Sequence, residues 1–182
     1  MSKKKIIFYS GSRADYGLLE PIIENLKNRA ELFLIIGPHH FEKSLGTSKK
    51  YIKKNFFRKI YNCKSKVNYK SVDINKFIYS SLPNYKKIIE KINPNLVVLL
   101  GDRYEVLSFA IASFFQNAKI CHLHGGEKTT GSIDDTIRHV ITKLSHYHFT
   151  TNNIYKKRVL SLGENKKNIF NFGSIGAEVA KE

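Results

Sequence analysis

The chain has 182 residues, which is enough for one domain with a substantial core. Hydrophobic residues make up 42% of it and aromatic residues 12%, a composition that excludes a disordered protein. The formal net charge of +16 suits an anionic partner, either a nucleic acid or a smaller phosphate-bearing molecule. The distribution of the lysines and arginines along the chain is needed to choose between these two kinds of partner.

A strand is predicted over residues 5–10, followed by a polar loop over 11–17 and a helix that runs to residue 27. The apolar run after the first lysines is too short for a signal peptide. In the loop, Gly11 gives the backbone freedom, and Arg13 can bind a phosphate beside the free N–H groups of the helix start. A salt bridge between Arg13 and Asp15 is the alternative. The loop is not GxGxxG, so we expect no nicotinamide cofactor.

A second strand is predicted over 31–36, and the segment 39–69 is the least regular, with a short helix and variable excursions. Lysines are densest over 49–70, where aromatic residues lie among them. Such aromatics can stack on bases, or they can form the inward face of irregular helices, which we favour. Lysines also recur throughout this Ile- and Asn-rich chain, which indicates codon bias rather than a binding stripe. We therefore predict no nucleic-acid partner. The aromatic residues concerned are Tyr51, Phe56, Phe57, Tyr61 and Tyr69.

A helix is predicted over 74–92, ending before Pro94, and an uninterrupted apolar strand over 96–100. Such a strand is typical of a parallel sheet covered on both faces. No apolar run is long enough to cross a membrane. Asp102 directly follows the strand, where it can cap the next helix or act on a substrate. Arg103 and Glu105 are expected to serve the helix start or the interior wall.

The two cysteines have no paired spacing. Cys63 lies in the lysine-rich segment and Cys121 near the end of an apolar strand. Structural thiols in a reducing compartment are the default for such residues. With neither a signal peptide nor a membrane span predicted, we expect a soluble cytoplasmic protein.

A helix is predicted over 105–115 and a strand over 119–123, at whose end His122 and His124 alternate with Leu123. This alternation predicts that both imidazoles point to the same face. A His-x-His pair is also a metal motif, but no cysteine pair and no further ligand spacing follow it, so we predict no metal site.

Two glycines and an acid come next. Gly125 and Gly126 permit close approach of the backbone to a ligand, and Glu127 follows at once. Paired glycines alone are weak evidence for a site. An imidazole before them and a carboxylate after them make the site interpretation stronger.

Two neighbouring aspartates open the next helix, predicted over 135–145. Ser132 or Asp134 can cap it, and either Asp135 with His139 or Asp134 with Arg138 fits the i,i+4 pairing rule. This accounts for one carboxylate and leaves the other free to face a ligand.

A strand over 146–150, a helix over 153–162 and a strand over 168–172 complete the series. Strand–helix alternation predicts a doubly wound, Rossmann-like α/β sheet. Ligands of such sheets bind beyond the carboxyl ends of the strands. Acidic and imidazole groups at consecutive strand ends suit proton transfer on a ligand there. We therefore predict an active site between residues 101 and 149.

Five segments carry a family resemblance: GSRADYG, GDRYE, HLHGGE, GSIDDTIRH and ITKLSHYHF. In this order and spacing they resemble the hydrolysing UDP-N-acetylglucosamine 2-epimerases of sialic-acid and legionaminic-acid pathways, from Ile6 to Gly176. The resemblance implies one half of a two-domain GT-B arrangement with the active site in the interdomain cleft. It also implies that UDP-N-acetylglucosamine, or a diacetamido analogue, is converted to UDP and an N-acetylmannosamine-type sugar through a glycal intermediate, without a metal or redox cofactor.

The resemblance assigns roles by position. Asp102 and Asp134 match carboxylates that the family uses as catalytic acid–base groups. Arg13 matches the first-loop arginine that meets the UDP phosphates, and Gly11 lies beside it in that loop.

The family also has a third acidic residue, between the two aspartates in the sequence, and its match in this chain is less direct. Some relatives have a glutamate immediately before the glycine pair, where this chain has His124. We expect Glu127 to take this role with His124 assisting, and Gly125 and Gly126 to lie against the substrate. An apolar, closed cleft that tunes the carboxylate pKa is expected around them.

The resemblance also concerns the length. Family members carry a second domain, so we expect residues 1–174 to be the N-terminal domain and 175–182 to begin the crossing to a C-terminal domain that the chain lacks. That domain, or a partner chain, would supply most uridine contacts and a catalytic histidine, and full-length relatives commonly form homodimers. We expect no turnover by this chain alone.

Two other functions stay open: a non-catalytic module for nucleotide-sugar binding or dimerisation, and a glycosyltransferase half-domain. The acidic residues argue against the second. Binding without turnover would identify the first, and sugar transfer to an acceptor the second. The sequence does not separate the monoacetamido from the diacetamido substrate.

Overall fold

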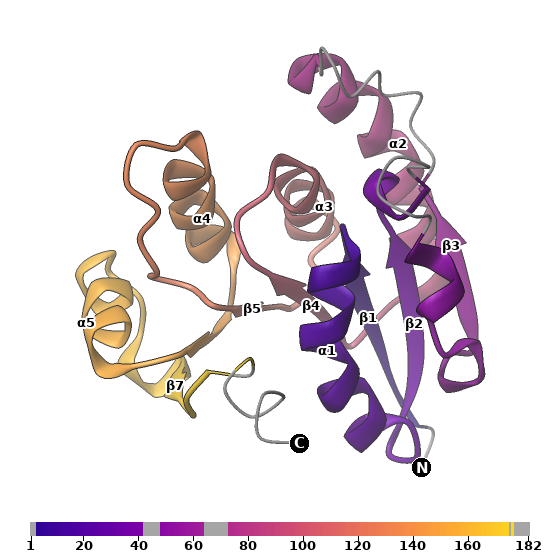
Figure 1. Ribbon diagram of the computed structural model, residues 1–182, viewed down its shortest axis with the longest axis horizontal. Coiled ribbons are helices and arrows are strands. Elements are labelled where there is room, and N and C mark those ends of the chain that lie inside the picture. The colour runs from indigo at the N-terminus through magenta and orange to yellow at the C-terminus, as the bar shows by residue number, and fades with distance from the viewer. Residues whose placement is uncertain (1–2, 42–47, 64–72, 175, 177–182) are drawn as a thin grey trace.

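Seven parallel strands form a single sheet in a computed structural model that describes residues 3–41, 48–63, 73–174 and 176. The strand order is β3-β2-β1-β4-β5-β6-β7 (Figure 1). This order and the helices between the strands confirm the predicted Rossmann-like α/β fold. The strands are β1 (Lys4–Ser10), β2 (Ala30–Ile36), β3 (Lys59–Asn62), β4 (Leu96–Leu100), β5 (Ile120–Leu123), β6 (Tyr147–Thr150) and β7 (Ile169–Asn171).

Within the described residues, five α-helices connect the strands, and most begin at a side chain suited to capping. Ser12, Asp73, Ser132 and Asn152 each accept a backbone N–H of the first turn of the helix that follows, as helix caps do. The helices are α1 (Arg13–Leu26), α2 (Ile74–Ile92), α3 (Tyr104–Phe115), α4 (Ile133–Leu144) and α5 (Asn153–Ser161).

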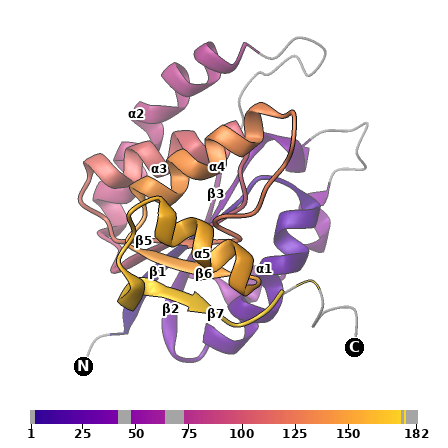
Figure 2. The same cartoon turned by 90° about the vertical axis from the view of Figure 1, so that its left-hand side faces the viewer.

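The core has two layers, one on each face of the sheet. On one face, α2, α3 and α4 pack through residues such as Tyr85, Phe109 and Ile141 against the strands. On the other face, α1 packs through Leu19 and Ile23. At the end of the sheet, α5 contacts β6 and β7 (Figure 2).

The winding of the sheet reverses beside β1. This strand pairs with β2 on one side and with β4 on the other, so that Ile6 lies opposite both Leu32 and Leu96. Ligands of doubly wound sheets bind at such a switch point, beyond the carboxyl ends of the strands. The loops after β1, β4 and β5 therefore border the expected crevice.

Two predictions for the first third of the chain need correction. The loop expected over 11–17 is shorter, because the side chain of Ser12 and that of Asp15 form a capping box and start α1 at Arg13. The segment 39–69 contains the strand β3, which was not predicted because lysine and asparagine residues interrupt its apolar pattern. Short 3₁₀ helices lie at Pro38–Phe41, Ser48–Tyr51 and Lys54–Phe56. Tyr69 lies outside the described residues.

The aromatic residues of the lysine-rich segment are mostly structural, as predicted. Phe57 is buried, and Phe56 and Tyr61 pack against the two core layers. Tyr51 is exposed and lies under the guanidinium of Arg13, 4.1 Å from it.

In the parts of the chain that the structure describes, no helix has the length and apolar character needed to cross a membrane. The predicted crossing over 175–182 lies outside the described residues except for Gly176.

Candidate functional site

Polar side chains from three segments meet at the carboxyl edge of β4 and β5. Asp102 lies two residues beyond β4, after Gly101, whose φ of 81° turns the chain. His124 and Glu127 follow β5, and Arg138 reaches them from the second turn of α4. The structure therefore brings together three of the four predicted catalytic residues around one arginine.

Arg138 is the centre of this group. Its side chain is only 7% exposed and forms a close ion pair with Asp102 through Nη2. Its Nη1 lies 3.4 Å from Glu127 Oε2 and 3.1 Å from the carbonyl oxygen of His124. The hydroxyl of Thr129 accepts a further bond from Nη2 at 3.1 Å.

Glu127 has partners on both sides. Its Oε1 lies 3.2 Å from Nδ1 of His124 and accepts a hydrogen bond of 3.0 Å from the hydroxyl of Thr151. Because Arg138 contacts the other oxygen, the carboxylate is oriented by three neighbours. It is still 24% exposed, so a ligand can approach it.

The two carboxylates differ in proton affinity. Burial raises the pKa of Asp102 above its usual value, against the opposing charge of Arg138, and the nearby Asp134 and Glu127 raise it further. Burial acts in the same direction on Glu127, but the hydrogen bond and charge of His124, the hydroxyl of Thr151 and the charge of Arg138 bring the pKa of Glu127 below its usual value. Neighbouring acids with opposite shifts suit a division between proton donor and acceptor.

The two neighbouring aspartates of α4 have different tasks. Asp135 accepts the backbone N–H of Thr129 at 2.9 Å and lies 3.9 Å from His139, so it is the structural one. Asp134 accepts a hydrogen bond from the hydroxyl of its cap, Ser132, and lies close enough to influence the pKa of Asp102. Arg138 pairs with Asp102 and Glu127 rather than with Asp134.

The prediction that His122 and His124 share a face is wrong. His122 is fully buried; its Nε2 lies 2.8 Å from the carbonyl oxygen of Gly101 and its Nδ1 3.1 Å from the hydroxyl of Thr142 in α4. His124 lies beyond the strand with a φ of 64°, which breaks the alternation. Among the described residues, no three His, Cys, Asp or Glu side chains are grouped so as to hold a metal ion.

The glycine pair makes room for the protein itself. A Cβ on Gly126 would lie 2.5 Å from the carbonyl oxygen of Tyr155 in α5, and its φ is 77°. A Cβ on Gly125 would lie 3.3 Å from both Nδ1 of His122 and Oγ1 of Thr142. Close packing of the loop therefore explains both glycines without a ligand.

The first loop is also partly occupied by its own side chains. The carboxylate of Asp15 accepts the N–H groups of Gly11 and Ser12 at 3.0 and 2.8 Å, so these two donors are not free for a phosphate. Arg13 is exposed and stacks on Tyr51, and it therefore does not form the alternative salt bridge with Asp15. Its guanidinium remains accessible at the switch point of the sheet.

Arg103 and Glu105 lie at the start of α3, and Glu105 also belongs to the interior, so each takes one of the two places predicted for them. The side chain of Glu105 is completely buried, 2.5 Å from Nε2 of His39 and 3.4 Å from Nη2 of Arg103. Burial alone would raise the pKa of Glu105, but the hydrogen bond of His39 and the charge of Arg103 lower it. This polar cluster lies between the first loop and Asp102.

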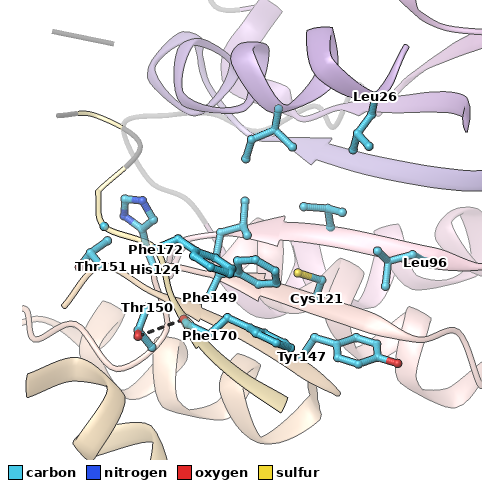
Figure 3. A pocket seen from close by; sticks show the side chains of 14 residues that line it. Leu26, Leu96, Cys121, His124, Tyr147, Phe149, Thr150, Thr151, Phe170 and Phe172 are labelled. Carbon is cyan, nitrogen blue, oxygen red and sulfur yellow. Dashed lines mark hydrogen bonds between the residues drawn. The ribbon is translucent and has the colours of Figure 1, made fainter. Parts of the chain in front are cut away.

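An apolar pocket of about 460 Å³ opens beside the site, on the face of the sheet that α1 covers only in part. Figure 3 shows His124 and Thr151 at one end of it and Leu96 and Tyr147 farther along. Of the four predicted catalytic residues, His124 lines this pocket and the three acids do not, so the pocket does not supply the closed apolar cleft expected around them. The pocket is lined by Ile22 and Leu26 of α1, by Leu96, Val98, Cys121, Leu123, Tyr147, Phe149, Thr150 and Phe170 of the strands, and by His124, Thr151, Phe172 and Gly173.

Sequence reasoning missed the central role of Arg138 and the contributions of Thr129 and Thr151. A helical arginine four residues after an aspartate is most simply paired within its own helix. A cue did exist: an arginine on the buried face of an amphipathic helix needs acceptors from other elements.

The comparisons with known proteins agree on one family. The model of the family described as UDP-N-acetylglucosamine 2-epimerase matches residues 24–182. A Campylobacter jejuni protein named GDP/UDP-N,N'-diacetylbacillosamine 2-epimerase (hydrolyzing) is 38% identical over all of this chain and 48% of its own length. Polysialic acid biosynthesis protein P7 of Escherichia coli is 37% identical, over 97% of this chain and 46% of its own length. The chain thus spans about half the length of these relatives.

Solved structures give the same fold. The UDP-GlcNAc 2-epimerase of Neisseria meningitidis bound to UDP-GlcNAc superposes with a TM-score of 0.80 at 15% identity, over 97% of this chain and 48% of that one. The UDP-GlcNAc 2-epimerase of Methanocaldococcus jannaschii in complex with UDP-GlcNAc and UDP has a TM-score of 0.79 at 22% identity, over 93% of this chain and 46% of that one.

Proposed function

The chain belongs to the UDP-N-acetylglucosamine 2-epimerase family, and we propose that it is the acid–base half of a hydrolysing 2-epimerase. Its substrate is UDP-N-acetylglucosamine or a diacetamido analogue, and the products are UDP and an N-acetylmannosamine-type sugar for the synthesis of sialic-acid-like sugars. The observation that carries this proposal is the convergence of Asp102, Glu127 and His124 on Arg138 at the carboxyl edge of the sheet.

The reaction needs two proton transfers at carbon 2. A carboxylate removes the proton of carbon 2 while the bond from carbon 1 to the UDP oxygen breaks, and its electron pair leaves with UDP. Water then adds to carbon 1 of the glycal and loses a proton, while an acid protonates carbon 2 from the opposite face. Asp102 and Glu127 are the two groups we assign to carbon 2, with Asp134 next to Asp102 and His124 hydrogen-bonded to Glu127.

Arg13 is the group we assign to the UDP phosphates, because it lies at the start of α1 beside the switch point and its guanidinium is exposed. In this proposal, Gly11, Gly125 and Gly126 lie beside the substrate. Gly125 and Gly126 also permit the close packing of their loop against its neighbours.

We further propose that residues 1–174 form the N-terminal domain and that residues 175–182 begin the crossing to a second domain. The support is that the relatives are about twice as long as the part that matches. The second domain, or a partner chain, completes the site, and the complete enzyme is a homodimer. A cytoplasmic location suits the two buried, unpaired thiols of Cys63 and Cys121, whose pKa burial raises to about 11 and about 12.

The test is UDP release from UDP-N-acetylglucosamine and its diacetamido analogue, by this chain with and without the separately produced C-terminal half of a close relative. Turnover is expected only when the halves are combined. Asp102→Asn and Glu127→Gln, at the two groups assigned to carbon 2, should each lower it about 100-fold or more, the usual contribution of an acid–base group.

Asp73→Asn is the matched control, because it makes the same change at an exposed helix cap of α2 and should leave the rate unaltered. Binding of UDP sugar without turnover, after confirmed assembly of the halves, would instead indicate a binding module. Transfer of the sugar to an acceptor would indicate a glycosyltransferase.

A further inference from the structure

We propose that Arg138 is the positioning residue of this site: its guanidinium fork holds Asp102 and Glu127, from two different loops, in one arrangement. The catalytic part of this inference rests on the proposed function. The contacts of Arg138 with the two carboxylates do not depend on that function. The inference starts from a single buried cation that contacts two of the proposed acid–base groups.

The contacts come from two different loops. Nη2 binds Asp102, from the loop after β4, and Nη1 binds the carbonyl oxygen of His124 and the carboxylate of Glu127, from the loop after β5. Thr129 adds a fourth acceptor. A planar fork with donors in fixed directions can set the distance between two loops, whereas the single ammonium nitrogen of a lysine cannot.

The charges explain why such a fork is needed. Asp102, Glu127 and Asp134 are carboxylates close enough for the last two to raise the pKa of the first. Without an opposing cation, a group of this kind takes up a proton rather than remain charged. Arg138 opposes this effect on both Asp102 and Glu127.

An ordinary structural ion pair is the competing explanation. It predicts a loss of stability on substitution, but no loss of kcat in an Arg138→Lys variant that folds and keeps a cation beside the carboxylates. It also predicts that any arginine holding this loop matters equally. Arg158 of α5 supplies the comparison, since it donates to the carbonyl oxygen of Gly126 at 2.6 Å and contacts neither carboxylate in the described structure.

The first experiment is a pH titration of carboxyl ¹³C resonances in the chain as it exists, with amide spectra to verify the fold. In Arg138→Gln, the pKa of both Asp102 and Glu127 should shift upward. In Arg138→Lys, which keeps the charge on one nitrogen, only one of the two should shift upward. In Arg158→Gln, both should stay as in the unsubstituted chain.

Unchanged titration of both carboxylates in folded Arg138→Gln would overturn the proposal. If that variant does not fold, Arg138→Lys decides: unchanged titration of both groups contradicts the role of the fork, and a shift of one supports it.

The second experiment measures steady-state rates of the combined halves. Arg138→Lys should lower kcat about 100-fold, the usual cost of misplaced catalytic groups, with little change in KM, and should move the acid limb of the pH–rate profile upward. A rate and profile equal to those of the unsubstituted enzyme would contradict the proposal. If the unsubstituted halves are inactive while the titration shifts occur, the proposed function fails and the positioning role stands.

Discussion

His122 and His124 are two residues apart, yet their surroundings make them chemically different. His122 is fully buried, and burial lowers its pKa to about 3. His124 lies at the edge of the pocket with its Nδ1 on a carboxylate. One imidazole therefore supports the fold, and the other is available to the site.

The neutral state of His122 has a measurable effect on stability. The unfolded histidine binds a proton below a pH of about 6.5, whereas the folded one does so only near a pH of 3, so stability should fall as the pH drops between these values. The slope is about 1.4 kcal/mol per pH unit for one histidine. His40, whose pKa burial lowers to about 4, adds a second such contribution down to that pH.

The measurement is the free energy of unfolding in urea from pH 7 to pH 4. His122→Gln should flatten its dependence on pH by about one proton. A pH dependence equal to that of the unsubstituted chain would show that His122 does not stay neutral in the folded chain.

The residue types of the site followed from the sequence, but their partners did not. Asp102 and Glu127 could be located because each follows a strand in a sheet whose strand ends share one edge. The pairing of Arg138 with both depends on the path of two loops, which no local pattern encodes. The same holds for the left-handed backbone of His124, which overturned the predicted alternation.

At the scale of elements, α5 is held against the site loop by a contact that only glycine permits. Gly126 lies under Tyr155 and Val159, and a Cβ there would be 2.5 and 2.8 Å from their nearest atoms. The packing of this helix and the position of Glu127 are therefore coupled through one residue.

Gly126→Ala should lower the free energy of unfolding by about 2–5 kcal/mol, because overpacking adds to the strain of a left-handed alanine. Gly163→Ala is the control: its φ is 86°, but nothing lies within 4 Å of the added Cβ, so it should cost only about 1–2 kcal/mol. Urea unfolding of both variants is the measurement. Equal losses would mean that the contact with α5 is not tight.

Helix and strand positions were predictable wherever one periodicity dominated. The apolar run of β4 predicted a strand, and the apolar residues at helical spacing in α2 predicted a helix. The type of each element was correct, and its ends were correct or nearly so. The strand β3 was missed, because it pairs on one side only and its sequence, KIYN, has no clear alternation. Its place is fixed by pairing with β2, a tertiary effect.

At the scale of the whole molecule, the two faces of the sheet are covered unequally. Over β5 to β7, the face that carries the apolar pocket presents Phe149, Phe170 and Phe172, whose rings lie against one another. Phe172 is 78% exposed. An apolar area of this kind on a chain that spans half the length of its relatives should bind hydrophobic probes.

Phe172→Ser should reduce the fluorescence of the dye ANS bound to the chain, because it removes a ring from the border of the pocket. Tyr79→Ser changes an aromatic residue of similar exposure, 83%, on α2 away from the pocket and should have little effect. The comparison is made at equal protein concentration and pH. An equal reduction in the two variants would show that the pocket is not where the dye binds.

The position of β1 in the sheet also determines when the site can form during synthesis. Its inner neighbour is β4, with Ile6 opposite Leu96, so the ribosome must complete most of the first hundred residues before this pairing exists. At ordinary rates of translation, this leaves one edge of β1 unpaired for on the order of ten seconds. Pairing over such a separation is slow and exposes a strand edge to other chains. The pairing of β1 with β4 is therefore a late product of folding. Conditions that favour aggregation of nascent chains should lower the yield of folded chains while leaving chains that have already folded unaffected.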